Sequence, residues 1–203
     1  LVGSEMCIRD STKAVLTVEK VGKVDLPAPD IFFGNSKMEV TDTDIYKSDQ
    51  VFTRGQMITV TGIDNLNEWW IDPDFFEKQS DGTLKFLPIN GDYRVTANGI
   101  LKYFSVIALK DGKPAKLQDD GTGAIWAIGK GIGKPSVASS EVGWEPGKAL
   151  CLAQVAPKKY QLTLKAGETL KTSGDWEAIS FKFFYQNDWG GEFSNYASNT
   201  LVE

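Results

Sequence analysis

The 203-residue sequence contains no histidine, and this absence excludes several kinds of chemistry at once. Histidine is the usual general base near neutral pH, the most common metal ligand, and the partner of the nucleophile in Ser/His and Cys/His catalytic pairs. The two cysteines, Cys7 and Cys151, are too few for a zinc site made by cysteines alone or for a framework of several disulfides. We therefore expect no metal and no cofactor.

Basic clusters and long apolar runs are also missing. The formal net charge is -5, from 22 basic and 27 acidic residues, and Lys and Arg nowhere form a run. Such a chain has no electrostatic attraction to a phosphate backbone, which argues against nucleic acid as a partner. No stretch approaches about 18 uncharged apolar residues, so no segment is predicted to span a membrane. The 41% of apolar residues, including 11% aromatics, is sufficient for packed cores.

The first eleven residues, LVGSEMCIRDS, resemble a peptide produced when sequencing-adapter DNA is translated at the edge of an assembled read. We exclude residues 1–11 from reasoning about the fold, the alternative being a natural leader. The natural N-terminus, with any signal peptide or lipid-attachment cysteine, is then expected to lie outside this sequence.

Short stretches of alternating apolar and polar residues, broken by Gly, Pro, Asn and Asp, predict antiparallel β-sheets. One short helix is predicted, with Asp72 as its cap, Pro73 in its first position and Asp74 to Lys78 completing it. The strands are expected at residues 13–18, 57–61, 93–97, 101–109, 124–128, 149–155, 160–164 and 179–185.

A polar segment with glycine and proline, KDGKPAKLQDDGTG at residues 110–123, divides the chain. The sequence therefore predicts an all-β fold of two tandem antiparallel β-sandwich units with one short helix. The N-terminal unit is expected at residues 12–110, a linker at 111–122 and the C-terminal unit at 123–203. A sandwich typically takes about 100 residues, whereas residues 121–203 supply 83. We therefore expect the C-terminal unit to be truncated.

The segment DWEAISFKFFYQNDWGGEFSNY, residues 175–196, gathers aromatic and amide side chains around one strand and the loop that leaves it. Alternation places one set of the strand's residues in a core: Ile179, Phe181, Phe183 and Tyr185. Lys182 then points away from that core, beside Phe184. The loop that follows adds two glycines, which let a ligand approach closely, and three side chains: Asn187, Asp188 and Trp189.

An aromatic ring flanked by amide, carboxylate and ammonium groups is suited to binding a sugar. The CH-rich face of a pyranose packs on the ring, while its hydroxyls form hydrogen bonds with the polar neighbours. The alternative for Trp189 is structural, with the ring closing the end of the sandwich.

The other tryptophans divide by context. Trp144 lies in a loop framed by glycine and proline, so its ring is expected to be displayed. Trp126 lies within an apolar run, which favours core packing, although it is kept as a site candidate. Trp69 and Trp70 are adjacent, so in an extended chain one ring packs and the other is exposed.

Two catalytic interpretations fail on detail. The run Gly129-Lys-Gly-Ile-Gly-Lys134 has neither the glycine nor the Ser/Thr of a phosphate-binding loop at the required positions and is read as a glycine-rich turn between strands. A carboxylate pair for glycoside hydrolysis needs a defined separation that the sequence does not set. We expect its candidates to be surface residues, and the protein not to be an enzyme: Asp175, Glu177, Asp188 and Glu192.

The C-terminal unit resembles the carbohydrate-binding β-sandwiches of SusE/SusF-like outer-membrane lipoproteins, which belong to glycan-uptake systems. The resemblance rests on these features: Ala124–Gly129 as an opening strand, Gly143-Trp144, the Tyr160 strand, Phe181-Lys182-Phe183, and the Asp188-Trp189-Gly190 turn with Tyr196. The loop after Trp189 is longer than the one typical of the family, and no glycine follows Tyr196. The N-terminal unit resembles a companion domain of similar proteins.

The resemblance implies two sandwiches of the immunoglobulin-like or carbohydrate-binding-module-like kind in a non-catalytic surface protein. It implies Trp189 and Trp144 as an aromatic platform for an oligosaccharide or polysaccharide, with Lys182, Asn187 and Asp188 as hydrogen-bonding residues. It further implies an outer-membrane, surface-exposed location through a lipid anchor absent from this chain, and a glycan transporter complex as partner. The alternative is a structural or adhesion module without a glycan site.

Overall fold

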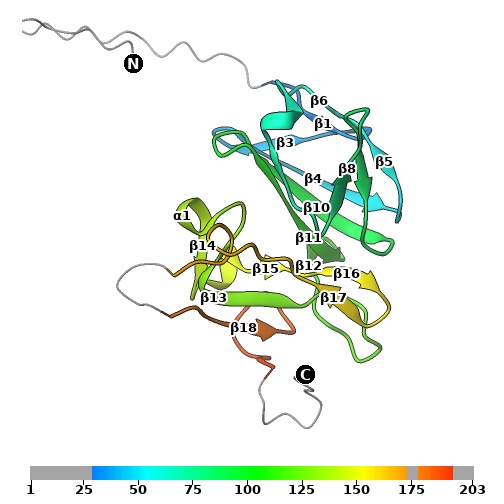
Figure 1. Ribbon diagram of the computed structural model, residues 1–203. Helices are drawn as coiled ribbons and strands as arrows, with labels where there is room; N and C mark the ends of the chain where they lie inside the picture. The colour runs from blue at the N-terminus through cyan, green and yellow to red at the C-terminus, as the bar shows by residue number, and fades with distance from the viewer. Residues whose placement is uncertain (1–28, 173–177, 194–203) are drawn as a thin grey trace, which may run out of the picture.

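The computed structural model describes residues 29–172 and 178–193 and confirms an all-β chain of two units (Figure 1). The strand expected at residues 13–18 lies outside the described residues, as does the leader at residues 1–11. Among the described residues, no helix is long and apolar enough to cross a membrane.

The N-terminal unit is built around one large sheet in the order β12-β11-β10-β4-β3, with β7 pairing in parallel with β11. The strands of this sheet are β3 (Glu39–Asp42), β4 (Ile45–Phe52), β7 (Trp70–Ile71), β10 (Gly91–Asn98), β11 (Tyr103–Lys110) and β12 (Lys113–Pro114). Two small sheets cover it: β2-β1-β6, from Ser36–Lys37, Phe32–Phe33 and Val60–Thr61, and β5-β9-β8, from Met57–Ile58, Leu84–Phe86 and Phe76–Lys78. A 3-10 turn, η1 (Leu66–Glu68), precedes β7.

The predicted alternation is seen in β10, where Tyr93, Val95 and Ala97 are buried. Strand β11 alternates in the same way, because Phe104 and Val106 are buried while Tyr103 and Ser105 are only partly so. The stretch at residues 101–109 is therefore not buried on both faces, and the second face of this sheet turns toward the C-terminal unit. Strand β12 extends the same sheet, so part of the expected linker belongs to the N-terminal unit.

The C-terminal unit is organised by β13 (Trp126–Gly133), which pairs with β18 (Ser180–Phe184) on one edge and with β14 (Glu141–Gly143) and β15 (Leu150–Cys151) on the other. The remaining elements are α1 (Val137–Ser140), η2 (Pro146–Lys148) and the hairpin of β16 (Ala153–Ala156) and β17 (Lys159–Gln161).

The glycine run at residues 129–133 lies inside β13 and is not a turn. A Cβ at Gly129 would lie 2.3 Å from the Cα of Phe181, so only glycine allows β18 to pair this closely. The glycines are therefore explained by sheet packing.

One hydrophobic cluster spans both units, and a second lies within the C-terminal unit. Trp126, Cys151 and Ala153 of the C-terminal unit belong to the same buried cluster as the phenylalanines of the N-terminal unit. The Trp126 indole Nε1–H donates a hydrogen bond to the carbonyl of Ala115 at 2.9 Å. Because apolar contacts and a backbone-directed hydrogen bond both cross the boundary, the units pack as neighbours.

The predicted helix at residues 72–78 is wrong. Residues 73–75 form one turn, in which the Asp72 carbonyl accepts hydrogen bonds from the amides of Phe75 at 3.1 Å and Phe76 at 2.9 Å, and β8 then begins at Phe76. The Asp72 carboxylate does cap this turn, because it accepts the amide of Asp74 at 3.0 Å. The one described α-helix is α1, where Ser136 provides the cap.

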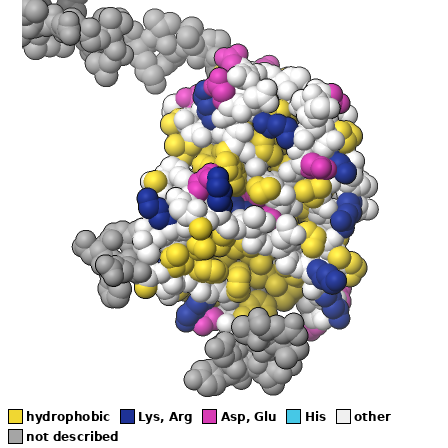
Figure 2. Space-filling view, viewed as in Figure 1, with side chains coloured by type: hydrophobic (Ala, Val, Ile, Leu, Met, Phe, Trp, Pro, Cys, Tyr) yellow, Lys and Arg dark blue, Asp and Glu magenta, His cyan; other side chains and the backbone are white. Residues whose placement is uncertain are grey.

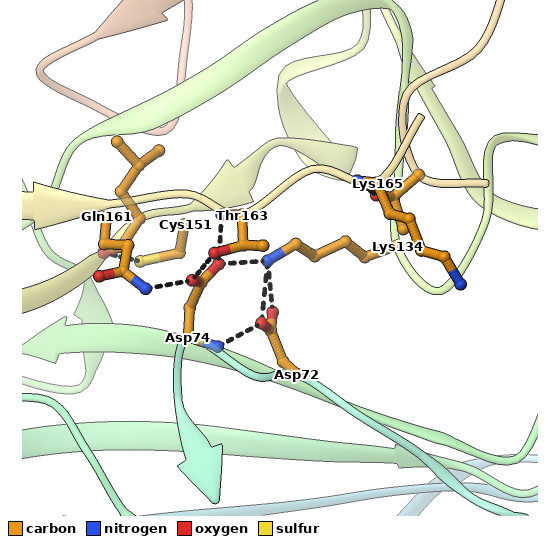
Figure 3. Close-up of polar contacts among 9 residues, drawn as sticks. Asp72, Asp74, Lys134, Cys151, Gln161, Thr163 and Lys165 are labelled. Carbon is orange, nitrogen blue, oxygen red and sulfur yellow. Dashed lines mark hydrogen bonds and ion pairs between the residues drawn. The ribbon is translucent and has the colours of Figure 1, made fainter. Parts of the chain in front are cut away.

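A buried ion-pair network explains why the turn ends there (Figure 3). The ammonium of Lys134, from the C-terminal unit, lies 2.8 Å from a carboxylate oxygen of Asp72 and 2.8 Å from one of Asp74. The same Asp74 carboxylate accepts hydrogen bonds from Gln161 Nε2 at 2.8 Å and Thr163 Oγ1 at 2.6 Å. The three charged side chains are at most 7% exposed, so the network is a buried connection between the units.

The two carboxylates of this network differ in proton affinity. Burial raises the pKa of Asp72 above its ordinary value, although the Lys134 ammonium opposes this. Burial also raises the pKa of Asp74, but Lys134 and the hydrogen bonds from Thr163 outweigh it, so the pKa of Asp74 lies below its ordinary value. Asp72 therefore has the higher proton affinity of the two carboxylates.

Replacing Lys134 with methionine removes the ammonium and leaves two buried carboxylates without a cation. We expect Lys134→Met to lower the free energy of unfolding by about 3–5 kcal/mol, measured by urea denaturation at neutral pH. Acidification should make the stability of the variant more similar to that of the wild type. Without the ammonium, burial should raise the pKa of both carboxylates in the folded variant, so the folded state takes up protons at a higher pH than the unfolded state does.

Two controls separate this effect from a general loss of lysine. Lys148 forms an exposed pair with Glu145, so Lys148→Met should cost about 0–1 kcal/mol. Adding Asp72→Asn and Asp74→Asn to Lys134→Met should recover most of the loss. A Lys134→Met deficit no larger than that of Lys148→Met would contradict the proposed importance of the network.

Candidate functional site

Two loop-borne tryptophans lie together on the C-terminal unit. Trp144 follows β14, and Trp189 lies in the turn that follows β18. Their ring centroids are 6.5 Å apart and their planes differ by 24°, which is an offset, near-parallel arrangement. The residues are 37% and 51% exposed. The structure thus brings the two predicted platform residues side by side, and we call them the tryptophan pair.

The turn that carries Trp189 is held by its own polar groups. The Asp188 carboxylate accepts the amide of Trp189 at 2.7 Å, and the Gln186 amide nitrogen donates to the Trp189 carbonyl at 2.6 Å. The backbone of Tyr185 pairs with that of Gly191, where a Cβ would lie 2.3 Å from the Tyr185 ring. Gly191 is therefore required by the turn itself, and the Asp188 carboxylate has a structural partner.

The Trp189 ring also rests on the core. It meets Phe184 edge-on, with centroids 6.1 Å apart and planes at 80°. Phe184 is 2% exposed and pairs with Trp126 across β13 and β18. The base of the Trp189 ring is thus anchored, while about half of the residue remains open to solvent.

Lys182 and Glu192 form an ion pair at the surface of the same hairpin. Their charged atoms are 2.8 Å apart, and the two side chains are 48% and 37% exposed. The predicted hydrogen-bonding residue Lys182 therefore already has a carboxylate partner. Glu145 and Lys148, on the loop after Trp144, form a similar exposed pair at 2.9 Å.

Asn187 differs from its neighbours because its side chain turns inward. Its Oδ1 atom is buried and has no hydrogen-bond partner among the described residues. The residue lines a cleft between the two units. Among the predicted hydrogen-bonding residues, Asn187 thus has a buried oxygen atom that could accept a hydrogen bond from a ligand.

The predicted faces of β18 are wrong in part. Phe181 packs against the core and Lys182 is exposed, as expected. Phe184 points into the core, whereas Ile179, Phe183 and Tyr185, which were expected in the core, are 39%, 38% and 44% exposed. The pairing of β18 with β13 decides this, because Phe184 lies opposite the buried Trp126. Figure 2 shows hydrophobic side chains gathered over the β13 and β18 region of the visible face.

Trp126 is a core residue. Its side chain is 0% exposed and its indole nitrogen is bonded to the Ala115 carbonyl. The core packing that its apolar run favoured is therefore confirmed, and its ring is not displayed as those of the tryptophan pair are. Tyr196 lies outside the described residues, as do Asp175 and Glu177.

The described residues offer neither a cluster of metal ligands nor a reactive thiol. No group of three or more His, Cys, Asp or Glu side chains within residues 29–172 and 178–193 could hold a metal ion. Burial raises the pKa of the Cys151 thiol to about 12, so Cys151 stays protonated and unreactive near neutral pH.

Sequence reasoning missed the N-terminal side of the cleft. Trp69 is 7% exposed and stacks on Phe104 at 4.7 Å, whereas Trp70 is only partly buried and lines the cleft with Tyr103. The adjacent tryptophans predicted that one ring would pack and the other would not. They did not indicate which surface the second ring would face.

The comparisons assign each unit to a family model. Residues 17–117 match the model described as "Domain of unknown function (DUF5125)", and residues 120–202 match "Domain of unknown function (DUF5121)". No curated protein matches the chain, and no solved structure matches it. What the fold and the site define is an all-β protein of two units with a displayed tryptophan pair.

The contrast between Trp126 and Trp189 can be tested through stability. We expect Trp126→Ala to cost about 3–5 kcal/mol of unfolding free energy, because it removes a fully buried ring. Trp189→Ala should cost about 1 kcal/mol, because half of the residue is already in water and one edge-on contact is lost. Chemical denaturation of both variants gives the comparison. Equal losses would mean that Trp189 is structural.

Proposed function

We propose that this protein binds oligosaccharide or polysaccharide without chemically changing it, and that the tryptophan pair is the platform. The observation that carries the proposal is the near-parallel, solvent-open arrangement of Trp144 and Trp189, whose centroids are 6.5 Å apart. Two ring faces displayed together suit the CH-rich face of a sugar, which gains from apolar contact without requiring charge. Amide and carboxylate groups beside the rings are available to hydroxyls.

The local charge favours a neutral glycan. Lys182 is paired with Glu192, and Lys148 is paired with Glu145. Asp188 adds a further exposed carboxylate on the Trp189 turn. A site whose ammonium groups are already paired and whose remaining charge is negative offers little attraction to sulfated or uronic-acid polymers.

The location proposed for the protein is the outer-membrane surface, with a glycan transporter complex as its partner. This part of the proposal is supported by the sequence resemblance to SusE/SusF-like lipoproteins. Protease treatment of intact source cells is the direct test. Degradation before the cells are broken is expected, whereas full protection would place the protein elsewhere.

Tryptophan fluorescence tests the proposed binding. We expect neutral gluco-, manno- or xylo-oligosaccharides to change the emission in a saturable way, and polygalacturonate to do so weakly. Trp144→Ala and Trp189→Ala should each weaken binding by about two- to tenfold, because one ring contact is worth about 0.5–1.5 kcal/mol. Calorimetry on the same variants gives affinities that do not depend on the lost fluorophore.

Phe183→Ala is the matched control, because it removes an exposed ring from the same hairpin without touching the tryptophan pair. Its affinity should equal that of the wild type. If the whole neutral panel produces neither heat nor an emission change, the structural or adhesion module becomes the better interpretation.

A further inference from the structure

A cleft of about 790 Å³ lies between the two units, within the usual size range of ligand sites. One wall is the outer face of the large N-terminal sheet at β10 and β11, together with β7. The other wall is formed by α1, β14 and the η2 loop of the C-terminal unit. Figure 1 shows β10 and β11 on one side of the boundary and α1 and β14 on the other.

The register of the strands places aromatic, amide and hydroxyl side chains together on the N-terminal wall of the cleft. Tyr103 pairs with Trp70 across β7 and with Asn98 across β10, and Ser105 pairs with Thr96. Paired residues in a ladder point to the same face. Since the alternate residues of β11 are in the core, these five side chains share the face turned to the cleft, and all five line it.

This wall combines two rings with amide and hydroxyl groups. The Asn98 Oδ1 atom accepts the amide of Leu101 at 2.9 Å, which leaves its NH₂ group as a donor. Across the cleft, Ser139 and Ser140 contribute hydroxyls that are 3.2 Å apart. Hydroxyls that both donate and accept suit a polyhydroxylated ligand.

Both lysines of the cleft already have carboxylate partners. Lys134 lies against Asp72, and Lys148 against Glu145. Glu141 accepts the backbone amide of Gly131 at 2.9 Å. The cleft therefore offers rings and hydrogen-bonding groups without an unpaired ammonium group, which suits an uncharged ligand better than an anionic one.

The cleft and the tryptophan pair are built from the same two segments, although Trp144 and Trp189 do not themselves line the cleft. Gly143 and Glu145, the residues on either side of Trp144, both line it. Asn187 also lines it, from the turn that carries Trp189, and its buried Oδ1 has no partner among the described residues. The same two segments thus build the platform and one wall of the cleft.

We propose that one neutral oligosaccharide chain occupies both places, lying on the tryptophan pair and continuing into the cleft between Trp70 and Tyr103 on one side and the serines of α1 on the other. This inference rests on the proposed function and adds to it that the N-terminal unit contributes binding groups. The bound chain is therefore longer than the platform alone can cover.

Filling the cleft tests the inference. Ser105→Phe places a ring in the middle of the N-terminal wall and leaves the tryptophan pair unchanged. With gluco-, manno- and xylo-oligosaccharides from disaccharide to hexasaccharide, we expect wild-type affinity in calorimetry to rise with length by about tenfold or more, as further ring contacts form. The Ser105→Phe variant should bind disaccharides as tightly as the wild type does, but its affinity should not increase with the length of the oligosaccharide.

Thr41→Phe is the control, because Thr41 lies on exposed β3 of the same sheet and does not line the cleft. It should show the wild-type dependence on length. Ser139→Phe fills the cleft from the opposite wall and should behave as Ser105→Phe does, so the test stands if one variant fails to fold.

The outcomes are distinguishable. If the wild type binds and both filled variants keep the full rise with length, the cleft is not part of the site, while the proposed function stands. If wild-type affinity does not rise with length, the inference is also wrong. If no oligosaccharide binds to the wild type at any length, the proposed function itself fails.

Discussion

The geometry of this protein depends on one buried ammonium group shared by two carboxylates. Lys134 reaches from the C-terminal unit to Asp72 and Asp74 in a tight turn of the N-terminal unit. Two acidic side chains could not be buried together without a cation, and hydrogen bonds from Gln161 and Thr163 satisfy the oxygens that remain. The network ties the turn after β7 to the strands of the other unit, so it holds both walls of the cleft in register.

The candidate site has the same two-part construction. The C-terminal unit displays Trp144 and Trp189 on loops set by short hydrogen bonds and required glycines, and the N-terminal sheet presents Trp70 and Tyr103 across the cleft. Non-catalytic sugar binding relies on ring faces and neutral donors and acceptors, not on groups that titrate near neutral pH. A chain without histidine can supply all of these.

Sequence prediction succeeded where local periodicity decides the outcome. The burial of Tyr93, Val95 and Ala97 follows from alternation, and the exposure of Trp144 follows from its glycine and proline neighbours. Sequence prediction failed where a contact with a residue far away in the chain decides the conformation. A helix was predicted after Asp72, but the chain forms one turn, in which the Asp72 carboxylate also binds Lys134, 62 residues away. The positions of Phe183 and Phe184 were exchanged in the prediction, because pairing with β13, not the strand's own pattern, orients Phe184.

By itself, the sequence determined the all-β class, the positions of half of the eighteen described strands and the residue types available for binding, because alternation and turn residues act over a few neighbours. The tertiary structure alone decided that Trp144 and Trp189 meet and that Trp70 faces the second unit. These features depend on contacts between residues far apart in the chain, and such contacts leave no local pattern to read.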